Sequence, residues 1–110
     1  MTTVTPKKLA QSNLDETAVE FYEVPAGKRA QVTEMWIANT SGTSSREVTL
    51  YAHGTSSENT LLHSLSVEEG VTYVIDGSKI VLEETEVLAA KQDNGTDVVV
   101  TAYGVEEDVS

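Results

Sequence analysis

Short apolar or alternating runs, separated by turn residues, recur along the whole chain. The segments PAGK, NTSGTSS, GTSSEN, EEG, DGS and DNGTD are rich in residues that supply positive φ angles or side-chain caps. This spacing is typical of all-β proteins, and it predicts about eight strands. The expected strands are residues 17–24, 30–39, 46–53, 61–67, 71–75, 79–82, 86–91 and 97–105.

This pattern predicts an all-β fold, an antiparallel β-sandwich or jelly roll. Helix has little support, because the two candidate segments, residues 14–19 and 81–90, contain Val and Thr. Residues 1–15 are polar, include Pro6 and lack clean alternation. We therefore expect an N-terminal arm over residues 1–15 and one β-sandwich domain over residues 16–110.

Alternation within the strands indicates which faces are buried. In REVTLYAHG, Val48, Leu50 and Ala52 share one face, which we expect to be core. The segments QVTEMWIAN and DVVVTAYGV instead carry apolar groups on both faces. Such strands lie at the centre of a well-covered sheet, contribute to an oligomer interface or are covered by an overlying arm. The candidates for that interface are Met35, Trp36, Ile37, Val99 and Tyr103.

The stretch FYEVPAGKR is either the mouth of a binding site or a corner between two strands. Pro25 fixes φ and cannot donate to a ladder, and Gly27 permits a turn. Lys28 and Arg29 solvate the corner before the next strand. The sequence therefore favours a corner.

Composition narrows the class of protein. The chain has 110 residues, enough for one domain with its own core, and no Cys. Its 18 acidic and 7 basic residues give a net charge of −11, which repels phosphate backbones, so we expect no nucleic-acid partner. No apolar run approaches the ~20 residues of a membrane span, so we expect no membrane partner either.

Residues that could carry chemistry are few. His53 and His63 match no metal or hydrolase spacing, and no GxSxG segment is present. The segment DNGTD, residues 93–97, has the oxygen ligands of half a calcium loop, but it lacks the rest of that pattern. We expect a hairpin turn there, with calcium as the open alternative. No enzymatic activity, catalytic residue, cofactor or metal site is expected.

The run from PKKLAQSN through EFYEVPAGKRAQVTEMWIANTS, with the closing VVVTAYGVE, resembles small structural proteins of tailed bacteriophages and prophages. Their pattern is an N-terminal arm, a Tyr-x-Val-Pro-Ala-Gly-Lys turn, a strand ending in Asn-Thr-Ser, and a C-terminal strand ending in Gly-Val-Glu. The match is carried here by Tyr22, Val24, Pro25, Ala26, Gly27, Lys28, Ala38, Asn39, Thr40 and Ser41.

The resemblance implies a virion structural protein: a capsid decoration protein, a head fibre or a tail accessory. We expect a capsid decoration protein that binds the outside of a phage head as a small oligomer, with a trimer favoured by analogy. Its partners would be the major capsid protein or other virion proteins, and it would be made in the host cytoplasm. The alternative is a tail or baseplate adhesion module, in which loop residues near His53 or Asp93 contact a host glycan.

The expected arm carries two of the chain's basic residues and two apolar anchors. We expect Lys7, Lys8, Leu9 and Leu14 to contact a neighbouring subunit or the capsid surface. The alternative is a first strand paired within its own domain or a frayed chain end.

Overall fold

The structure, a computed structural model, describes residues 4–76 and 79–109, and within these ranges it has nine β-strands and one 3-10 helix. Residues 1–3 of the expected arm, residues 77–78 of the DGS turn and residue 110 of the expected domain lie outside the described residues. The elements are β1 (Val4–Asn13), β2 (Val19–Glu23), β3 (Lys28–Asn39), β4 (Arg46–Ala52), η1 (Ser57–Asn59), β5 (Thr60–Val67), β6 (Thr72–Asp76), β7 (Val81–Leu82), β8 (Val87–Gln92) and β9 (Val98–Asp108).

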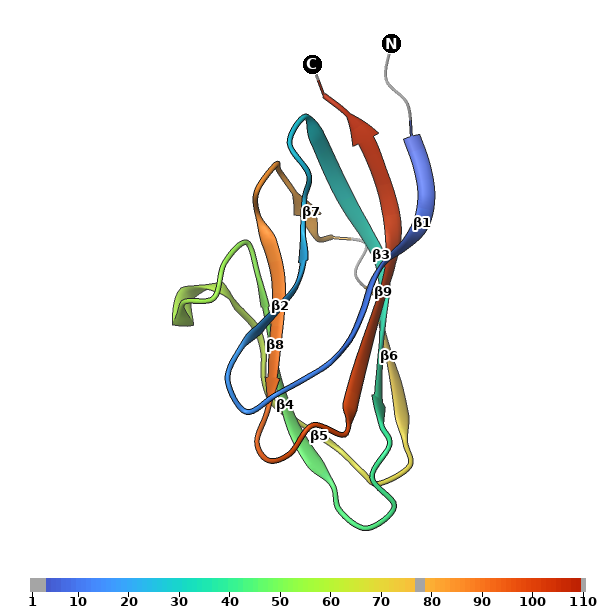
Figure 1. The fold of residues 1–110 in the computed structure, drawn as a ribbon, viewed down its shortest axis with the longest axis vertical. Helices are drawn as coiled ribbons and strands as arrows, with labels where there is room; N and C mark the ends of the chain where they lie inside the picture. Colours follow the sequence, from blue (N-terminus) through green and yellow to red (C-terminus); the bar gives the residue numbers. More distant parts are fainter. Residues whose placement is uncertain (1–3, 77–78, 110) are drawn as a thin grey trace.

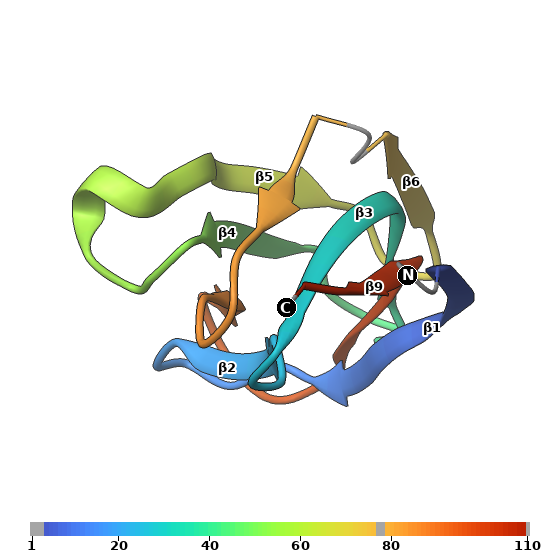
Figure 2. The ribbon, with the colours of Figure 1, turned by 90° about the horizontal axis from the view of Figure 1, so that it is seen from above.

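Two antiparallel sheets pack face to face, which confirms the predicted sandwich (Figure 1). One sheet, here called the β3 sheet, has the order β1-β9-β3-β6, with β7 also paired to β3. The other, the β4 sheet, has the order β2-β8-β4-β5. Seen from above, the two form separate layers (Figure 2). The molecule is elongated, with extents of 50 × 25 × 19 Å.

The core lies between the layers and follows the alternation of the strands. Val48, Leu50 and Ala52 of β4 are all buried and belong to the core cluster, as predicted. Burial of a Val or Leu side chain contributes about 1.5–3 kcal/mol to folding. The principal fully buried side chains are Leu14, Met35, Ile37, Leu50, Leu82, Leu88, Gln92, Val24, Val32, Val48, Val67 and Val98.

A β-bulge in β3 explains why that strand carries apolar groups on both faces. The register of β3 against β9 shifts between Val32 and Glu34. An extra residue in one strand reverses the side to which later side chains point. Val32 and Met35, three positions apart, therefore both face the core. The sequence pattern, taken without the bulge, placed these two residues on opposite faces.

The PAGK segment is a corner between the sheets, as predicted. It leads from β2 in the β4 sheet to β3 in the β3 sheet. The Lys28 amide donates to the carbonyl of Pro25 at 3.2 Å, and Gly27 adopts a φ of 78°. Without a Cβ, glycine takes this conformation at little cost. The Gly27 amide also donates to the carboxylate of Glu84 at 2.7 Å, which fixes the corner on the loop before β8.

Residues 4–13 form an edge strand of the β3 sheet. This strand, β1, pairs antiparallel with β9 from Val4 opposite Glu107 to Asn13 opposite Val99. A register shift occurs between Lys8 and Ala10. The structure thus adopts the alternative that the sequence left open, a first strand within its own domain. Edge strands tolerate proline and lysine, which explains why the polar sequence did not predict a strand.

Candidate interaction surface

Three adjacent rows of side chains cross the part of the β3 sheet where β6 pairs with β3, on the outer face that is turned away from the β4 sheet. Residues directly opposite each other in a ladder point to the same side. The registers of β1, β9, β3 and β6 therefore define rows that cross the sheet. In that strand order the rows are Lys8, Tyr103, Glu34 and Asp76; Gln11, Thr101, Trp36 and Val74; and Asn13, Val99, Ala38 and Thr72.

Apolar and aromatic side chains occupy the middle of this face. Trp36, Val74 and Tyr103 are 44%, 53% and 38% exposed. The rings of Trp36 and Tyr103 meet edge to face, with centroids 6.5 Å apart and an interplanar angle of 72°. This geometry favours the aromatic pair and holds both rings in place on the surface. An exposed patch of this kind is typical of a site that binds another protein.

Polar groups frame the aromatic pair. The Trp36 indole donates from Nε1 to Glu34 Oε1 at 2.9 Å. On the β1 side, Lys8 Nζ donates to Gln11 Oε1 at 3.3 Å, and Gln11 Nε2 donates to Thr101 Oγ1 at 3.1 Å. The face is therefore basic at its β1 edge and acidic toward β6.

The structure separates the five interface candidates into two groups. Met35 and Ile37 are 1% and 0% exposed and pack in this chain's own core, so no partner can reach them. Trp36 and Tyr103 lie on the outer face, and Val99 is half-buried in the row beside them. The sequence analysis missed Val74, which the predicted strand 71–75 contained but whose direction its short apolar run did not reveal.

The four candidate contact residues of the expected arm also divide. Leu14 is 1% exposed and belongs to the core cluster, and the partly buried Leu9 packs against that cluster. Lys7 Nζ forms an ion pair with Glu106 Oε1 at 3.1 Å. Lys8 is exposed on the outer face, which leaves it as the arm residue best placed for a partner.

A carboxylate is buried near the end of β9. Glu106 is one of the alternate residues of β9 whose side chains point toward the other sheet, and it is 7% exposed. The Tyr22 hydroxyl donates to its Oε2 at 2.5 Å, and Lys7 reaches Oε1. Burial is the largest influence and opposes the charged form, but these two hydrogen bonds and the positive charges of Lys7 and Lys28 together outweigh it and hold the pKa of Glu106 below its ordinary value. Burial and the bond to Glu106 raise the pKa of Tyr22 well above its usual range.

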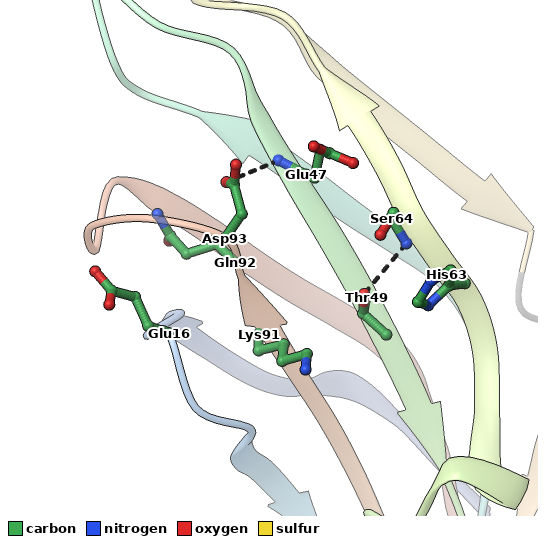
Figure 3. A pocket seen from close by; sticks show the side chains of 8 residues that line it. All are labelled: Glu16, Glu47, Thr49, His63, Ser64, Lys91, Gln92 and Asp93. Carbon is green, nitrogen blue, oxygen red and sulfur yellow. Dashed lines mark hydrogen bonds between the residues drawn. The ribbon is translucent and has the colours of Figure 1, made fainter.

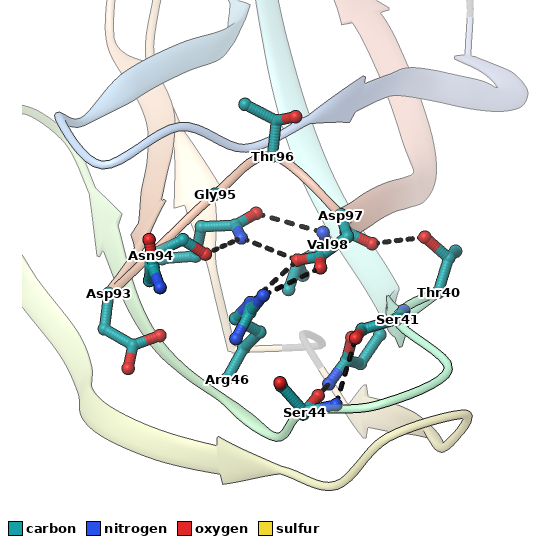
Figure 4. Close-up of polar contacts among 12 residues, drawn as sticks. Thr40, Ser41, Ser44, Arg46, Asp93, Asn94, Gly95, Thr96, Asp97 and Val98 are labelled. Carbon is teal, nitrogen blue, oxygen red and sulfur yellow. Dashed lines mark hydrogen bonds and ion pairs between the residues drawn. The ribbon is translucent and has the colours of Figure 1, made fainter.

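Oxygen atoms of the DNGTD turn take part in hydrogen bonds within the chain, so they do not form an open ligand set for a metal ion (Figure 4). Arg46 donates from Nε and from its second terminal nitrogen to the two carboxylate oxygens of Asp97, at 2.9 and 3.0 Å. The buried Gln92 amide donates to Asp97 Oδ1 at 2.9 Å and accepts from the Val98 amide at 3.0 Å. Arg46 lowers the pKa of Asp97 through these bonds. Both oxygens of Asp97 are therefore used within the chain.

An open pocket of about 300 Å³ lies on the outside of the β4 sheet (Figure 3). The side chains that line the pocket are polar, and some of them form hydrogen bonds within the chain. The Glu47 amide donates to Asp93 Oδ1 at 3.0 Å, and the Ser64 amide donates to Thr49 Oγ1 at 3.2 Å. The pocket is lined by Glu16, Glu47, Thr49, His63, Ser64, Lys91, Gln92 and Asp93.

The two histidines lie apart in the fold. His53 Nδ1 is 3.0 Å from Glu86 Oε1, beside the loop before β8, whereas His63 lines the pocket. In the part of the chain that the structure describes, no group of three or more His, Asp or Glu side chains is arranged to hold a metal ion. Over the same ranges, no helix is long and apolar enough to cross a membrane.

Comparison with known protein families and with curated protein sequences gave no match. Solved structures share the fold. A chain from Bacillus endospore appendages, described as a novel family of disulfide-linked pili, aligns over 100% of this chain and 92% of its own length, with a TM-score of 0.58 and 12% identity. A chain from the acid-stable capsid of Helicobacter pylori bacteriophage KHP30 aligns over 100% of this chain and 95% of its own, with a TM-score of 0.58 and 13% identity.

These likenesses define the class of fold. The chain is a β-sandwich whose architecture occurs in a phage capsid and in a bacterial pilus.

Proposed function

We propose that this chain is a non-enzymatic structural protein of a phage virion, and specifically a capsid decoration protein that binds the outer capsid surface as a small oligomer. The observation that carries the proposal is the exposed aromatic outer face of the β3 sheet. Trp36 and Tyr103 form an ordered pair there, flanked by Val74. Tyr and Trp are enriched where proteins meet, because their rings bury large areas at little entropic cost.

The cysteine content favours the capsid over the pilus as the relevant likeness. The Bacillus appendages are described as disulfide-linked, and this chain has no Cys with which to form such a link. Its contacts with neighbours therefore contain no disulfide bond. The phage capsid likeness, together with the resemblance to tailed-phage structural proteins, supports a virion location after synthesis in the host cytoplasm. The major capsid protein is the proposed partner, and the resemblance favours three copies of this chain.

A binding experiment tests the proposal. Phage particles lacking this protein are mixed with gold-labelled purified protein and viewed by electron microscopy. We expect label over the heads, and we expect Trp36→Ser to reduce it at least tenfold, since central aromatic residues dominate such interfaces.

Leu61→Ser is the matched control. Leu61 is also 44% exposed, but it lies on β5 in the other sheet. It should label heads as the wild type does. Label confined to tails, or equal loss in both variants, would contradict the decoration role.

A tail or baseplate adhesion module is the second candidate. It is favoured by the polar pocket, which includes Asp93, one of the two loop positions proposed for glycan contact. The pocket lacks an aromatic side chain for stacking on a sugar, which weakens this alternative. Glycan-array binding that is lost in Lys91→Ala and kept in Trp36→Ser would support it.

A further inference from the structure

The outer face of the β3 sheet is self-complementary in charge. Its first row runs from Lys8 on β1 through Tyr103 to Glu34 and Asp76 on the far side. The second row places Gln11 and Thr101 on the β1 side and Trp36 and Val74 on the β6 side. Each row is thus different at its two ends, with the aromatic pair between them.

We infer that the partner of this face is a second copy of the chain, packed face to face about a two-fold axis parallel to the strands between β9 and β3. The inference rests on the proposed function, in which the chain binds the capsid as a small oligomer, and it assigns the outer face of the β3 sheet to the contact between copies. A rotation about such an axis leaves each residue at the same height along the strands and reverses the left-to-right order of the strands in the second copy. It therefore places β1 of one copy over β6 of the other.

Charge selects this axis over the other two-fold arrangement. With the axis parallel to the strands, Lys8 lies over the Glu34 and Asp76 end of the same row in the partner. An axis across the strands would instead stack β1 on β1 and β6 on β6, so Lys8 would not meet the acidic end of the row in the partner. Opposite charges fix the register of an interface more than they add to its affinity. Sheets stacked in this way follow the aligned packing of β-sandwiches, with strands crossing at about −30°.

The same geometry brings the aromatic groups together. Tyr103 lies over the neighbourhood of the partner's Glu34, and Trp36 lies over the partner's Thr101 and Gln11. The apolar side of each indole ring is then removed from solvent, and the indole keeps its hydrogen bond to Glu34. The contact is isologous, so every favourable pair occurs twice.

The face is small, which sets the strength of the pair. Four strands ~4.8 Å apart and eight residues of ~3.3 Å give about 500 Å² per copy. A total near ~1,000 Å² is at the lower limit for a specific interface. A reversible dimer follows, in place of the three-fold ring that the resemblance favours, because a ring needs a different surface on each neighbour.

The test uses two charge reversals. Lys8→Glu places carboxylates against the partner's acidic end, and Glu34→Lys places ammonium groups against the partner's Lys8. Sedimentation equilibrium is run from about 1 µM to about 500 µM, the range in which so small an interface is expected to dissociate. We expect the wild type to dimerise and each reversal alone to weaken dimerisation at least tenfold.

Mixing the two variants is the decisive measurement. In a two-fold pair of unlike variants, each end of the row again brings an ammonium group to a carboxylate, so the mixture should dimerise more tightly than either variant alone. The emission of Trp36, the only tryptophan, should shift to shorter wavelength when the pair forms. Glu34→Gln, which keeps an acceptor for the indole, should weaken pairing less than Glu34→Lys, and circular dichroism checks that all variants fold.

Three outcomes would overturn the inference: a wild type that stays monomeric, reversals without effect, or a mixture that does not recover. A monomer that still labels phage heads through Trp36 would refute the pair and leave the decoration role standing. A dimer with the full reversal pattern that binds no particle would refute the decoration role and leave the pair standing.

Discussion

Glu106 is, among the buried residues that the structure describes, the only one that carries a full charge at neutral pH. It shares the inward phase of β9 with Val98, Val100 and Ala102, so the sequence did contain a signal for its burial. Its partner Tyr22 lies 84 positions away in the chain. Alternation can indicate which way a side chain points, but it cannot identify a partner across the sandwich.

Tyr22→Phe should lower the free energy of unfolding by about 1–2 kcal/mol, because it leaves one oxygen of the buried Glu106 without its donor. Chemical denaturation measures the change. Tyr51→Phe is the control, since Tyr51 has the same 8% exposure and its hydroxyl has no hydrogen bond among the described residues. That variant should differ from the wild type by less than ~0.5 kcal/mol. Equal losses in both variants would show that the bond to Glu106 contributes nothing.

The lowered pKa of Glu106 also predicts how stability depends on pH. A carboxyl whose pKa is lower in the folded state stabilises the protein above its ordinary pKa, and this contribution is lost as the pH falls through the folded value. Melting temperatures should therefore fall below about pH 4. The fall should be shallower in Glu106→Gln than in Glu69→Gln, a control in the exposed turn after β5. The same fall in melting temperature below about pH 4 in both variants would contradict the role given to Glu106.

At the scale of elements, the alternation of the sequence predicted eight of the described strands and missed β1. The missed strand is at an edge, where one side of the ladder is open and polar residues are tolerated. The bulge in β3 was also missed, although the spacing of Val32 and Met35 breaks the two-residue period. The candidate surface was predicted in part, because Trp36 and Tyr103 followed from strands that are apolar on both faces.

Gly104 is the point where β9 passes closest to its neighbours. A Cβ at this position would overlap the carbonyl oxygen of Gln31 and lie 2.9 Å from Leu9 Cδ1. Gly104→Ala should therefore destabilise the fold by about 2–3 kcal/mol, because it forces β9 away from β3 or β1. Thermal unfolding measures this loss.

Gly42→Ala serves as the comparison, since a Cβ at Gly42 would meet nothing within 4 Å. It should change stability by less than ~0.5 kcal/mol. A Gly104→Ala variant that melts like Gly42→Ala would contradict the tight packing of β9.

Deletion of residues 2–13 distinguishes an internal strand from an external arm. The deletion removes the partner of one side of β9, the packing of Leu9 and the lysine that pairs with Glu106. We expect the truncated chain to lose cooperative melting. Lys8→Ala, which changes only an exposed side chain of the same strand, should melt normally. Near-normal melting after the deletion would show that the segment acts outside the domain.

At the scale of the whole molecule, the net charge of −11 opposes compactness. Lys7, Lys28, Arg29 and Arg46 already form ion pairs, so most of the 18 acidic residues can only repel one another. NaCl raised from about 0.02 to about 0.3 M should increase stability by ~1 kcal/mol, or about 5 °C in Tm, through screening. A Tm that is flat or falls with salt would contradict this balance.

CaCl₂ at matched ionic strength separates screening from a specific site. Because Arg46 occupies both oxygens of Asp97, calcium should raise the Tm no more than NaCl does. A larger rise that disappears in Asp93→Asn would restore calcium binding at the turn.

The pairing of Val4 with Glu107 has a mechanical consequence. The first and last strands lie side by side and antiparallel, so their outer ends meet at one pole of the molecule (Figure 1). Tension applied through the two chain ends would peel β1 from β9 one hydrogen bond at a time, instead of shearing the whole ladder at once. Such peeling needs little force. In any assembly that bears load, this chain must therefore transmit stress through the broad surfaces of its sheets and not along its backbone.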